Sequence, residues 1–291
     1  MSDPARPFRS VLYIPGSNAR ALDKARTLPV DAIIFDLEDA VAIEAKAEAR
    51  ILLAETLKAG GYGARYQMVR LNGFDTDWGQ ADFETIAAIA PQAILLPKVG
   101  SAAQVAEVAA RLDAIPGCEN TAIWAMIETP LGVLNAAEIA GAPRMGGFIL
   151  GTNDLAKDLT TRFRTDREPL LTALQLCVLA ARAHGITVID GVYNAFKDED
   201  GLRVECEQGR DMGFDGKSLI HPAQVALANA SFAPTADEID LARRQIAAFE
   251  EAEARGQGVA VVDGRIVENL HIETARQTLA KAAAIAALEA A

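Results

Sequence analysis

The stretch Ala122-Ile123-Trp124-Ala125-Met126-Ile127-Glu128 shows the pattern that decides the fold: an unbroken apolar run that ends on a charged residue. Such runs are typical of strands that are buried on both faces of a parallel sheet. An Ala-rich segment follows, and it predicts a helix over 131–139. The same succession of apolar run and helical segment recurs eight times before about residue 230, so the chain predicts consecutive parallel βα units.

These units set the boundaries of the expected elements. The strands are expected at 11–14, 32–37, 66–71, 93–97, 121–127, 147–150, 187–189 and 216–220, and the helices at 19–26, 45–57, 83–89, 102–112, 131–139, 170–183, 202–212 and 223–229. Eight such units match the length of an α/β fold of the TIM (β/α)8 barrel type. A doubly wound open sheet is the alternative, but it normally carries a Gly-rich phosphate turn after its first strand. The turn here is Pro15-Gly16-Ser17-Asn18.

The C-terminal segment has a different pattern. Apolar residues recur at helical spacing over 236–253. Asp263-Gly264 between two short apolar runs is a strong hairpin signal, and an Ala-rich helix is expected over 272–288. We therefore expect a catalytic barrel over 1–232 and a small helix–hairpin–helix appendage over 233–291, which would serve as a lid, an oligomer contact or merely a cap.

The composition argues against several classes of protein. Forty acidic residues against 28 basic ones give a formal net charge of -12, whereas a nucleic-acid-binding protein normally carries the opposite sign. No apolar stretch approaches the roughly 20 residues that span a bilayer, and the N-terminus shows no secretory signal. Cys118, Cys177 and Cys206 form neither a disulfide framework nor a metal-binding spacing. We expect a cytoplasmic protein that binds neither nucleic acid nor a membrane.

Charged side chains collect at the C-terminal ends of the predicted strands, where the active site of such a barrel lies. Glu128 and Asp154 follow adjacent apolar runs and would project into one mouth. Two carboxylates there repel each other, so a proton or a cation must relieve them. Mg²⁺ is the natural candidate, because it takes one or two carboxylates and leaves positions for water and substrate oxygens. Zinc is disfavoured, because no His/Cys cluster accompanies the two carboxylates in the sequence. The alternative for each carboxylate is a helix cap or an ion pair with arginine.

Further polar residues complete the predicted mouth. Arg70 is suited to a bidentate grip on a carboxylate, or to a structural ion pair with Glu38. Lys98 is interpreted as a charge that balances the acidic mouth rather than as a Schiff-base lysine, and His221 as a structural histidine rather than a general base. The other polar residues at the strand ends are Asp36, Asp39, Asn72, Asn153 and Asp190. We expect the acids Asp36, Glu38 and Asp39 to support the site through pairs with Arg70, Lys98 or water.

Several of these motifs resemble the citrate lyase beta-subunit family, which includes the malyl-CoA and citramalyl-CoA lyases and belongs to the HpcH/HpaI aldolase superfamily. The most specific are Ile127-Glu128-Thr129-Pro130-Leu131-Gly132 and Gly151-Thr152-Asn153-Asp154-Leu155. The matches run in family order from about residue 9 to residue 275. The others are Arg9–Ser17, Phe35–Val41, Val69–Asn72, Leu96–Val99 and Gly216–Pro222.

The resemblance implies a Mg²⁺-dependent carbon–carbon lyase that cleaves or forms a 3-hydroxyacyl-CoA, such as malyl-, citramalyl- or citryl-CoA, with a 2-oxo acid and an acyl-CoA as the other partners. It implies that Glu128 and Asp154 bind the metal and substrate, and that Arg70 holds the carboxylate of the 2-oxo acid. It also implies a homo-oligomer, a trimer or hexamer, in which the C-terminal segment of one subunit closes over a neighbour's site. In that segment Glu268 stands where many relatives carry an aspartate that transfers a proton. The Glu268 side chain is one methylene longer, and we expect it to take the same catalytic role.

A CoA substrate would also need cations outside the mouth for its phosphates. The candidates on the first two predicted helices are Arg20, Lys24, Lys46 and Arg50.

Other functions remain open beside a free-standing CoA-ester lyase. One is a citrate lyase beta subunit that acts on a carrier-protein thioester, and another is a CoA thioesterase on the same scaffold. A pyruvate aldolase of free acids would share the barrel and the metal. An inactive barrel kept as an assembly component is disfavoured by the presence of Arg70, Glu128 and Asp154.

Overall fold

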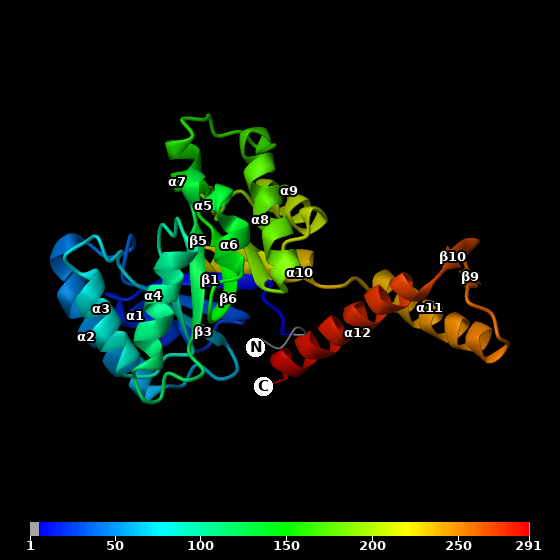
Figure 1. Ribbon diagram of the computed structural model, residues 1–291, viewed down its shortest axis with the longest axis horizontal. Coiled ribbons are helices and arrows are strands. Elements are labelled where there is room, and N and C mark those ends of the chain that lie inside the picture. The colour runs from blue at the N-terminus through cyan, green and yellow to red at the C-terminus, as the bar shows by residue number, and fades with distance from the viewer. Residues whose placement is uncertain (1–5, 291) are drawn as a thin grey trace. The chain divides into compact units, whose positions relative to one another are not determined.

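The computed structural model describes residues 6–290, and their contacts divide into two compact units, residues 8–232 and the C-terminal segment from residue 233. The first unit is a closed barrel of eight parallel strands in sequence order, with the last strand paired to the first (Figure 1). This confirms the predicted TIM barrel. None of the described helices is long and apolar enough to cross a membrane.

The strands agree with the predicted apolar runs to within two residues. They are β1 (Ser10–Pro15), β2 (Ala32–Asp36), β3 (Tyr66–Arg70), β4 (Ala93–Leu96), β5 (Ala122–Ile127), β6 (Met145–Leu150), β7 (Thr187–Asp190) and β8 (Gly216–Leu219). The longer helices around them are α1 (Ala19–Ala25), α2 (Lys46–Ala59), α3 (Gly79–Ala87), α4 (Ala102–Asp113), α8 (Leu171–His184), α9 (Glu199–Met212) and α10 (Val225–Phe232). Short 3-10 turns occur at η1 (Ile43–Ala45), η2 (Glu168–Leu170) and η3 (Pro222–Gln224).

Several helices begin a few residues earlier than predicted, and two helical regions differ in kind from the prediction. The single helix expected over 131–139 is broken into α5 (Pro130–Leu134) and α6 (Ala136–Ala140) at Asn135, whose side-chain amide donates to the Gly100 carbonyl at 2.7 Å. A further helix, α7 (Thr152–Asp158), follows β6 where no helix was expected. Its seven residues are too few to show an amphipathic period, and burial of Leu155 and Ala156 supports it instead.

Alternate residues of the strands fill the inside of the barrel. This interior cluster consists of Phe8, Val11, Ala32, Ile34, Met68, Ala93, Leu95, Trp124, Met126, Ile149 and Ile189. Because side chains along a strand alternate between its two faces, the residues two positions beyond Ile34, Met68 and Met126 also face inward. They are Asp36, Arg70 and Glu128, so the interior changes from apolar to charged at the C-terminal ends of the strands.

The C-terminal unit has a core of its own. It consists of α11 (Ala236–Ala254), the antiparallel hairpin of β9 (Ala260–Val262) and β10 (Arg265–Val267), and α12 (Asn269–Glu289). Its core cluster consists of Phe249, Ala252, Ala260, Val262, Val267 and Ile272. Asp263 and Gly264 both have positive φ angles, 49° and 74°, which is the backbone that the predicted two-residue turn requires.

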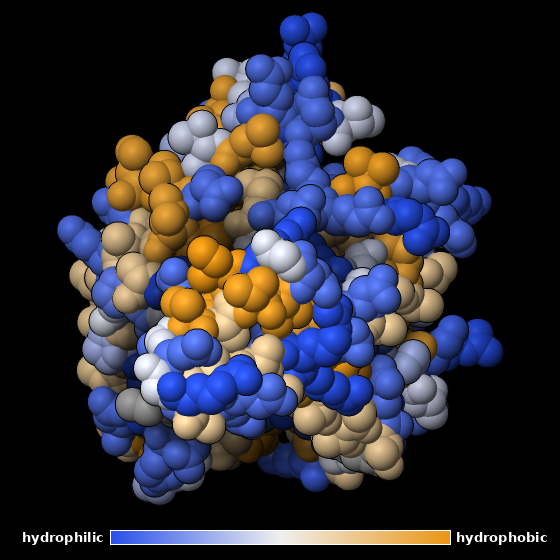
Figure 2. Space-filling model, turned by 90° about the vertical axis from the view of Figure 1, so that its right-hand side faces the viewer, coloured by the Kyte–Doolittle hydropathy of each residue, from blue (hydrophilic) through white to orange (hydrophobic). Residues whose placement is uncertain are grey.

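The hairpin also exposes apolar side chains. Val261 and Ile266 are 66% and 61% exposed, and Val259 and Leu270 are exposed beside them. Figure 2 shows hydrophobic residues, in orange, at the surface among hydrophilic ones. This unit therefore has an uncovered apolar surface on a small hairpin.

Candidate active site

A hollow of about 290 Å³ opens at the C-terminal ends of the strands. Its wall includes Arg70, Glu128 and Asp154, together with Asp36 and Asp39. The structure thus brings the predicted metal- and substrate-binding residues into one cavity.

Arg70 is fixed by the neighbouring strand. Asp36 and Arg70 are cross-strand partners in the β2–β3 ladder, and the guanidinium donates from Nε to Asp36 Oδ1 at 2.7 Å and from Nη2 to Oδ2 at 2.6 Å. The Asp36 carboxylate also accepts the backbone N–H groups of Glu38 and Ala40. The Nε/Nη2 fork of Arg70 is therefore occupied by Asp36 in this structure, and a contact between Arg70 and a substrate carboxylate stays a prediction.

The rest of the Arg70 guanidinium is also engaged. Its Nη1 lies 2.8 Å from Glu38 Oε2, which is the predicted ion pair, and 3.3 Å from Asp39 Oδ2. Its carbon Cζ lies 4.9 Å from the centre of the Tyr13 ring. Although burial lowers it, the nearby Asp36 carboxylate raises the pKa of Arg70 well above its ordinary value. Arg70 therefore supplies a permanent, immobile positive charge to the hollow.

Glu128 follows β5 and is 2% exposed. Its Oε1 accepts the backbone N–H of Lys98 at 2.7 Å, and Lys98 has a left-handed backbone with φ of 48°, a strained conformation of the kind that is kept where it serves a site. Burial raises the pKa of Glu128 to about 7. A Cβ at Gly151 would overlap the Glu128 side chain, so glycine is needed there.

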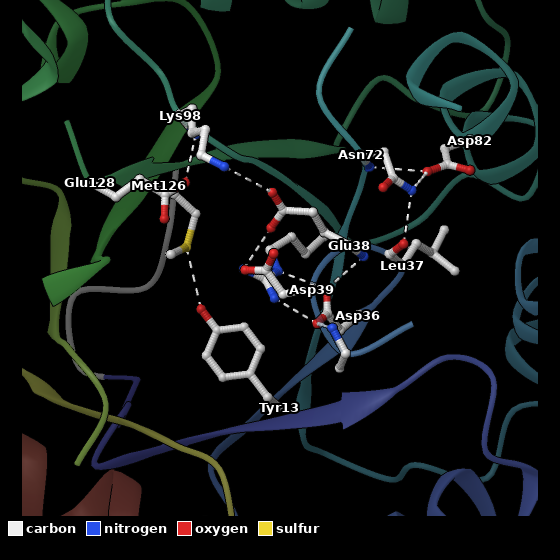
Figure 3. A network of polar contacts seen from close by, with 12 residues as sticks. Tyr13, Asp36, Leu37, Glu38, Asp39, Asn72, Asp82, Lys98, Met126 and Glu128 are labelled. Carbon is white, nitrogen blue, oxygen red and sulfur yellow. Dashed lines mark hydrogen bonds and ion pairs between the residues drawn. The ribbon is translucent and has the colours of Figure 1, made fainter. Parts of the chain in front are cut away.

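Lys98 points its ammonium at Glu38 (Figure 3), with Nζ 3.7 Å from Oε1. Burial raises the pKa of Glu38 to about 7. Burial lowers the pKa of Lys98, but the carboxylates of Glu38, Asp154 and Glu128 raise it above its ordinary value overall. An ammonium that holds its proton so firmly fits the predicted balancing charge better than a Schiff-base amine, which must be deprotonated.

The acids of the mouth outnumber its cations. Asp36, Glu38, Asp39, Glu128 and Asp154 surround Arg70 and Lys98. The half-buried Asp154 carboxylate, in the first turn of α7, accepts no hydrogen bond from residues 6–290, and neither does Glu128 Oε2. These two oxygen donors fit Mg²⁺, which needs few protein ligands. No group of three or more His, Cys, Asp or Glu within the described chain could hold a metal, which disfavours a closed, fully protein-coordinated site.

Tyr13 belongs to the site and was missed from the sequence. It lies on β1 and lines the hollow, and its hydroxyl donates to Met126 Sδ at 3.3 Å (Figure 3). Burial raises the pKa of the Tyr13 phenol, so it stays a protonated hydrogen-bond donor. The alternation along β1 could have found it, because Tyr13 is two residues beyond the interior Val11.

Some predicted residues lie outside the hollow. His221 caps the η3 turn, with Nδ1 accepting the Ala223 N–H at 3.1 Å, and its ring stacks on Phe196, as expected for a structural histidine. Asp190 belongs to a buried ion cluster with Arg167 and Lys217.

Both CoA candidates on α2 make contacts within the protein. Lys46 is buried, and its ammonium donates to the carbonyls of Leu37 and Glu38 and to Asn72 Oδ1. Arg50 pairs with the buried Asp82 at 2.7 Å. The Lys46 ammonium is not available to a phosphate, so that prediction is wrong, whereas a phosphate contact by Arg50 stays a prediction.

The remaining candidates lie on exposed elements. Arg20 and Lys24 are exposed on α1. Glu268 is exposed at the start of α12, and its backbone N–H donates to His271 Nδ1 at 3.0 Å. Their roles stay predictions.

A sequence model of the family described as HpcH/HpaI aldolase/citrate lyase matches residues 9–222. The chain belongs to this family. It is 64% identical, over 290 residues and the full length of both chains, to the (3S)-malyl-CoA thioesterase of Cereibacter sphaeroides strain ATCC 17023. It is 37% identical over 283 residues to citrate lyase subunit beta of Escherichia coli K12, covering 95% of this chain and 94% of the relative.

Solved structures of relatives share the barrel. The protein CitE from Mycobacterium tuberculosis, in complex with magnesium, acetoacetate and coenzyme A, superposes with a TM-score of 0.80 at 28% identity, covering 96% of this chain and 99% of that one. The citrate lyase beta subunit from M. tuberculosis, complexed with oxaloacetate and magnesium, has a TM-score of 0.69 at 31% identity, covering 79% and 99%. The chain is thus an enzyme of the HpcH/HpaI aldolase/citrate lyase family.

Proposed function

We propose that this family member is a Mg²⁺-dependent thioesterase that hydrolyses malyl-CoA to malate and CoA. The observation that carries the proposal is the 64% identity, over the whole chain, to relatives named (3S)-malyl-CoA thioesterase. The carbon–carbon lyase expected from the sequence becomes the second candidate, favoured by the 37% identity to citrate lyase subunit beta. Both reactions start from the same acyl-CoA and differ in the bond that breaks.

The metal site proposed here consists of Glu128 Oε2 and the Asp154 carboxylate, which accept no hydrogen bond from the described residues. Magnesium in the structures of the M. tuberculosis relatives supports this assignment. When bound, Mg²⁺ would supply a Lewis acid that polarises substrate oxygens. Arg70 adds fixed positive charge beside them, and Tyr13 supplies a protonated hydroxyl in the same wall.

Hydrolysis also needs a proton acceptor. As the water oxygen attacks the thioester carbonyl carbon, a base takes a water proton, the carbon–sulfur bond breaks, and the leaving thiolate takes up a proton to become CoA. Asp36 is saturated by four hydrogen bonds, and Asp39 is paired with Arg70. We propose Glu268 as the proton carrier, because the family resemblance implies a carboxylate at this position that transfers a proton.

The C-terminal unit would deliver Glu268 in an oligomer, for which we propose a trimer or hexamer. The uncovered apolar surface of the hairpin supports a subunit contact at this unit, and Glu268 directly follows β10. For the phosphates of CoA we propose Arg20 and Lys24, which are exposed on the helix after β1.

Product analysis tests the proposed function. The purified enzyme is incubated with malyl-CoA and Mg²⁺, and free thiol, malate, glyoxylate and acetyl-CoA are measured separately. We expect thiol and malate in equal amounts, and no turnover by Asp154→Ala or in EDTA. Stoichiometric glyoxylate and acetyl-CoA without thiol would overturn the thioesterase and establish the lyase. Full turnover in EDTA would overturn the metal site.

A further inference from the structure

A second hollow, of about 280 Å³, lies beside the catalytic one and has no role in the proposed reaction. It is formed by α7, the loop 159–167 and the segment after β7. Asn153 and Asn194 line both hollows, and their side-chain amides hydrogen-bond to each other at 2.8 and 3.2 Å. The two cavities are therefore neighbours separated by polar side chains.

Arg167 lines this second hollow and also carries a buried donor that no described residue satisfies. The residue is 5% exposed, its Nη1 donates to both oxygens of Asp190 at 2.8 Å, and its Nε donates to Gln208 at 2.7 Å. Its buried Nη2 has no hydrogen-bond partner among the described residues. Leaving a buried donor unsatisfied costs about 1–3 kcal/mol, and more when it is charged. A ligand in the hollow would remove that cost.

The surrounding ion cluster fixes Arg167 without satisfying Nη2. Lys217 Nζ lies 3.2 Å from Asp190 Oδ2 and 2.6 Å from Glu205 Oε1, so two cations face two carboxylates. Although burial raises it, the cations of Lys217 and Arg167 lower the pKa of Asp190 below its ordinary value. Arg167 is also held in the left-handed region, with φ of 53°, which is unfavourable for a residue with a side chain. The guanidinium is thus held rigidly in place.

The lining of the hollow selects the chemistry of a ligand. Three of its residues, Arg162, Arg164 and Arg167, are cations against one carboxylate, Glu205, in a chain with a net charge of -12. Arg164 is paired with Asp166, whereas Arg162 forms no ion pair within the described chain. The apolar part of the wall consists of Ala156, Phe163, Pro169, Leu170 and Val192. Cations beside apolar walls suit an anion with a hydrocarbon body.

We propose that this hollow is a second binding site for a small organic carboxylate, which accepts a hydrogen bond from Arg167 Nη2, is attracted by Arg162, and packs its hydrocarbon part against Leu170 and Phe163. Inorganic phosphate has no apolar part to match these walls. The site is separate from the metal-binding carboxylates, so the proposal goes beyond the proposed function and does not depend on it.

Calorimetric titration of the full-length protein with propionate in EDTA tests this site without the catalytic metal. Arg167→Gln would leave Asp190 short of a buried partner and risks unfolding, so the test uses residues at the rim. We expect one propionate per wild-type chain, and at least tenfold weaker binding to Arg162→Gln and to Ala195→Phe, which fills the mouth. The exposed Arg203→Gln and Ala88→Phe, which make the same changes outside the hollow, should bind as the wild type does.

Three results would overturn the proposal: no binding to the wild type, equal binding of phosphate, or binding unaffected by both rim variants, which would place the ligand elsewhere. A crystal structure of the propionate complex gives the direct check, with a carboxylate oxygen expected within hydrogen-bond distance of Arg167 Nη2. Water alone at that atom would show that hydration satisfies it.

Discussion

Glu38, which pairs with Arg70, is a half-buried acid that the fold makes reluctant to ionise. Burial raises its pKa from an ordinary value of 4.5 to about 7, so folding favours its protonated form. Its contribution to stability is therefore complete below about pH 4.5 and is lost as the pH rises to about 7. At about 1.4 kcal/mol for each tenfold change in proton affinity, the loss is at most about 3 kcal/mol.

The variant Glu38→Gln, which mimics the protonated form, should escape this loss. We expect its stability relative to the wild type to increase between pH 4.5 and 8 in EDTA, measured by urea unfolding at each pH. The exposed Glu84→Gln is the matched control and should show a constant difference. A flat difference for Glu38→Gln as well would contradict the raised pKa.

Glu128 should make Mg²⁺ binding depend on pH, with tighter binding as the pH rises. Its pKa of about 7 means that the carboxyl is mostly protonated below neutrality, and Mg²⁺ must displace that proton. We expect the apparent Kd for Mg²⁺, measured by calorimetry, to weaken by about tenfold for each pH unit below 7. In Glu128→Gln the metal should bind weakly at every pH. A wild-type Kd that is constant between pH 5.5 and 7 would remove Glu128 from the metal site.

Arg70 is held by Asp36 through a fork that lysine cannot reproduce. We expect Arg70→Lys to lower kcat/KM by about a hundredfold or more, since about 3 kcal/mol of fixed charge and orientation is lost. Arg50→Lys is the matched control, because Arg50 also pairs with a buried aspartate but lies outside the hollow. Equal activity of the two variants would make Arg70 a purely structural residue.

At the scale of elements, the strands were predictable because their burial on both faces leaves unbroken apolar runs, such as 122–127. The seven-residue helix α7 was not, since tertiary packing rather than periodicity supports it. Lys46 was misassigned for a related reason. The sequence shows a lysine at the start of a helix, but only the fold shows that the carbonyls at the end of β2 surround its ammonium.

The start of α7 is also where the metal site is most sensitive to a small change. A methyl group at Gly151 would overlap the Glu128 side chain, so Gly151→Ala must displace that carboxylate. We expect at least tenfold weaker Mg²⁺ binding and a stability loss of about 1–3 kcal/mol, as for overpacking of a core. Gly258→Ala, with open space around it, should change neither. Unchanged metal affinity in Gly151→Ala would mean that Glu128 has room to move or does not bind the ion.

At the scale of the whole molecule, the sequence predicts the barrel and the catalytic hollow because both follow from strand order and strand ends. Closure in sequence order places Asp36, Arg70 and Glu128 at one mouth wherever the helices lie. The second hollow was not predictable, because Arg167 comes from a loop, whereas its ion partners Asp190 and Glu205 come from β7 and α9. Likewise, no pattern in the sequence around Glu268 places it at a site, and only the family resemblance predicts a role for it.

Complementation between two defective subunits tests whether Glu268 acts in the site of a neighbouring subunit. If Glu268 acts in a neighbour's site, then Glu268→Gln and Asp154→Ala chains are each inactive alone, but a mixed oligomer contains sites with an intact barrel and an intact neighbouring tail. Random assembly of equal amounts makes about one quarter of the sites complete, because each site draws on two subunits. We therefore expect co-expressed chains to recover about a quarter of the wild-type rate of thiol release. No recovery would exclude action across subunits, since a site built within one chain always keeps one of the two defects, and full activity of Glu268→Gln alone would remove Glu268 from the reaction.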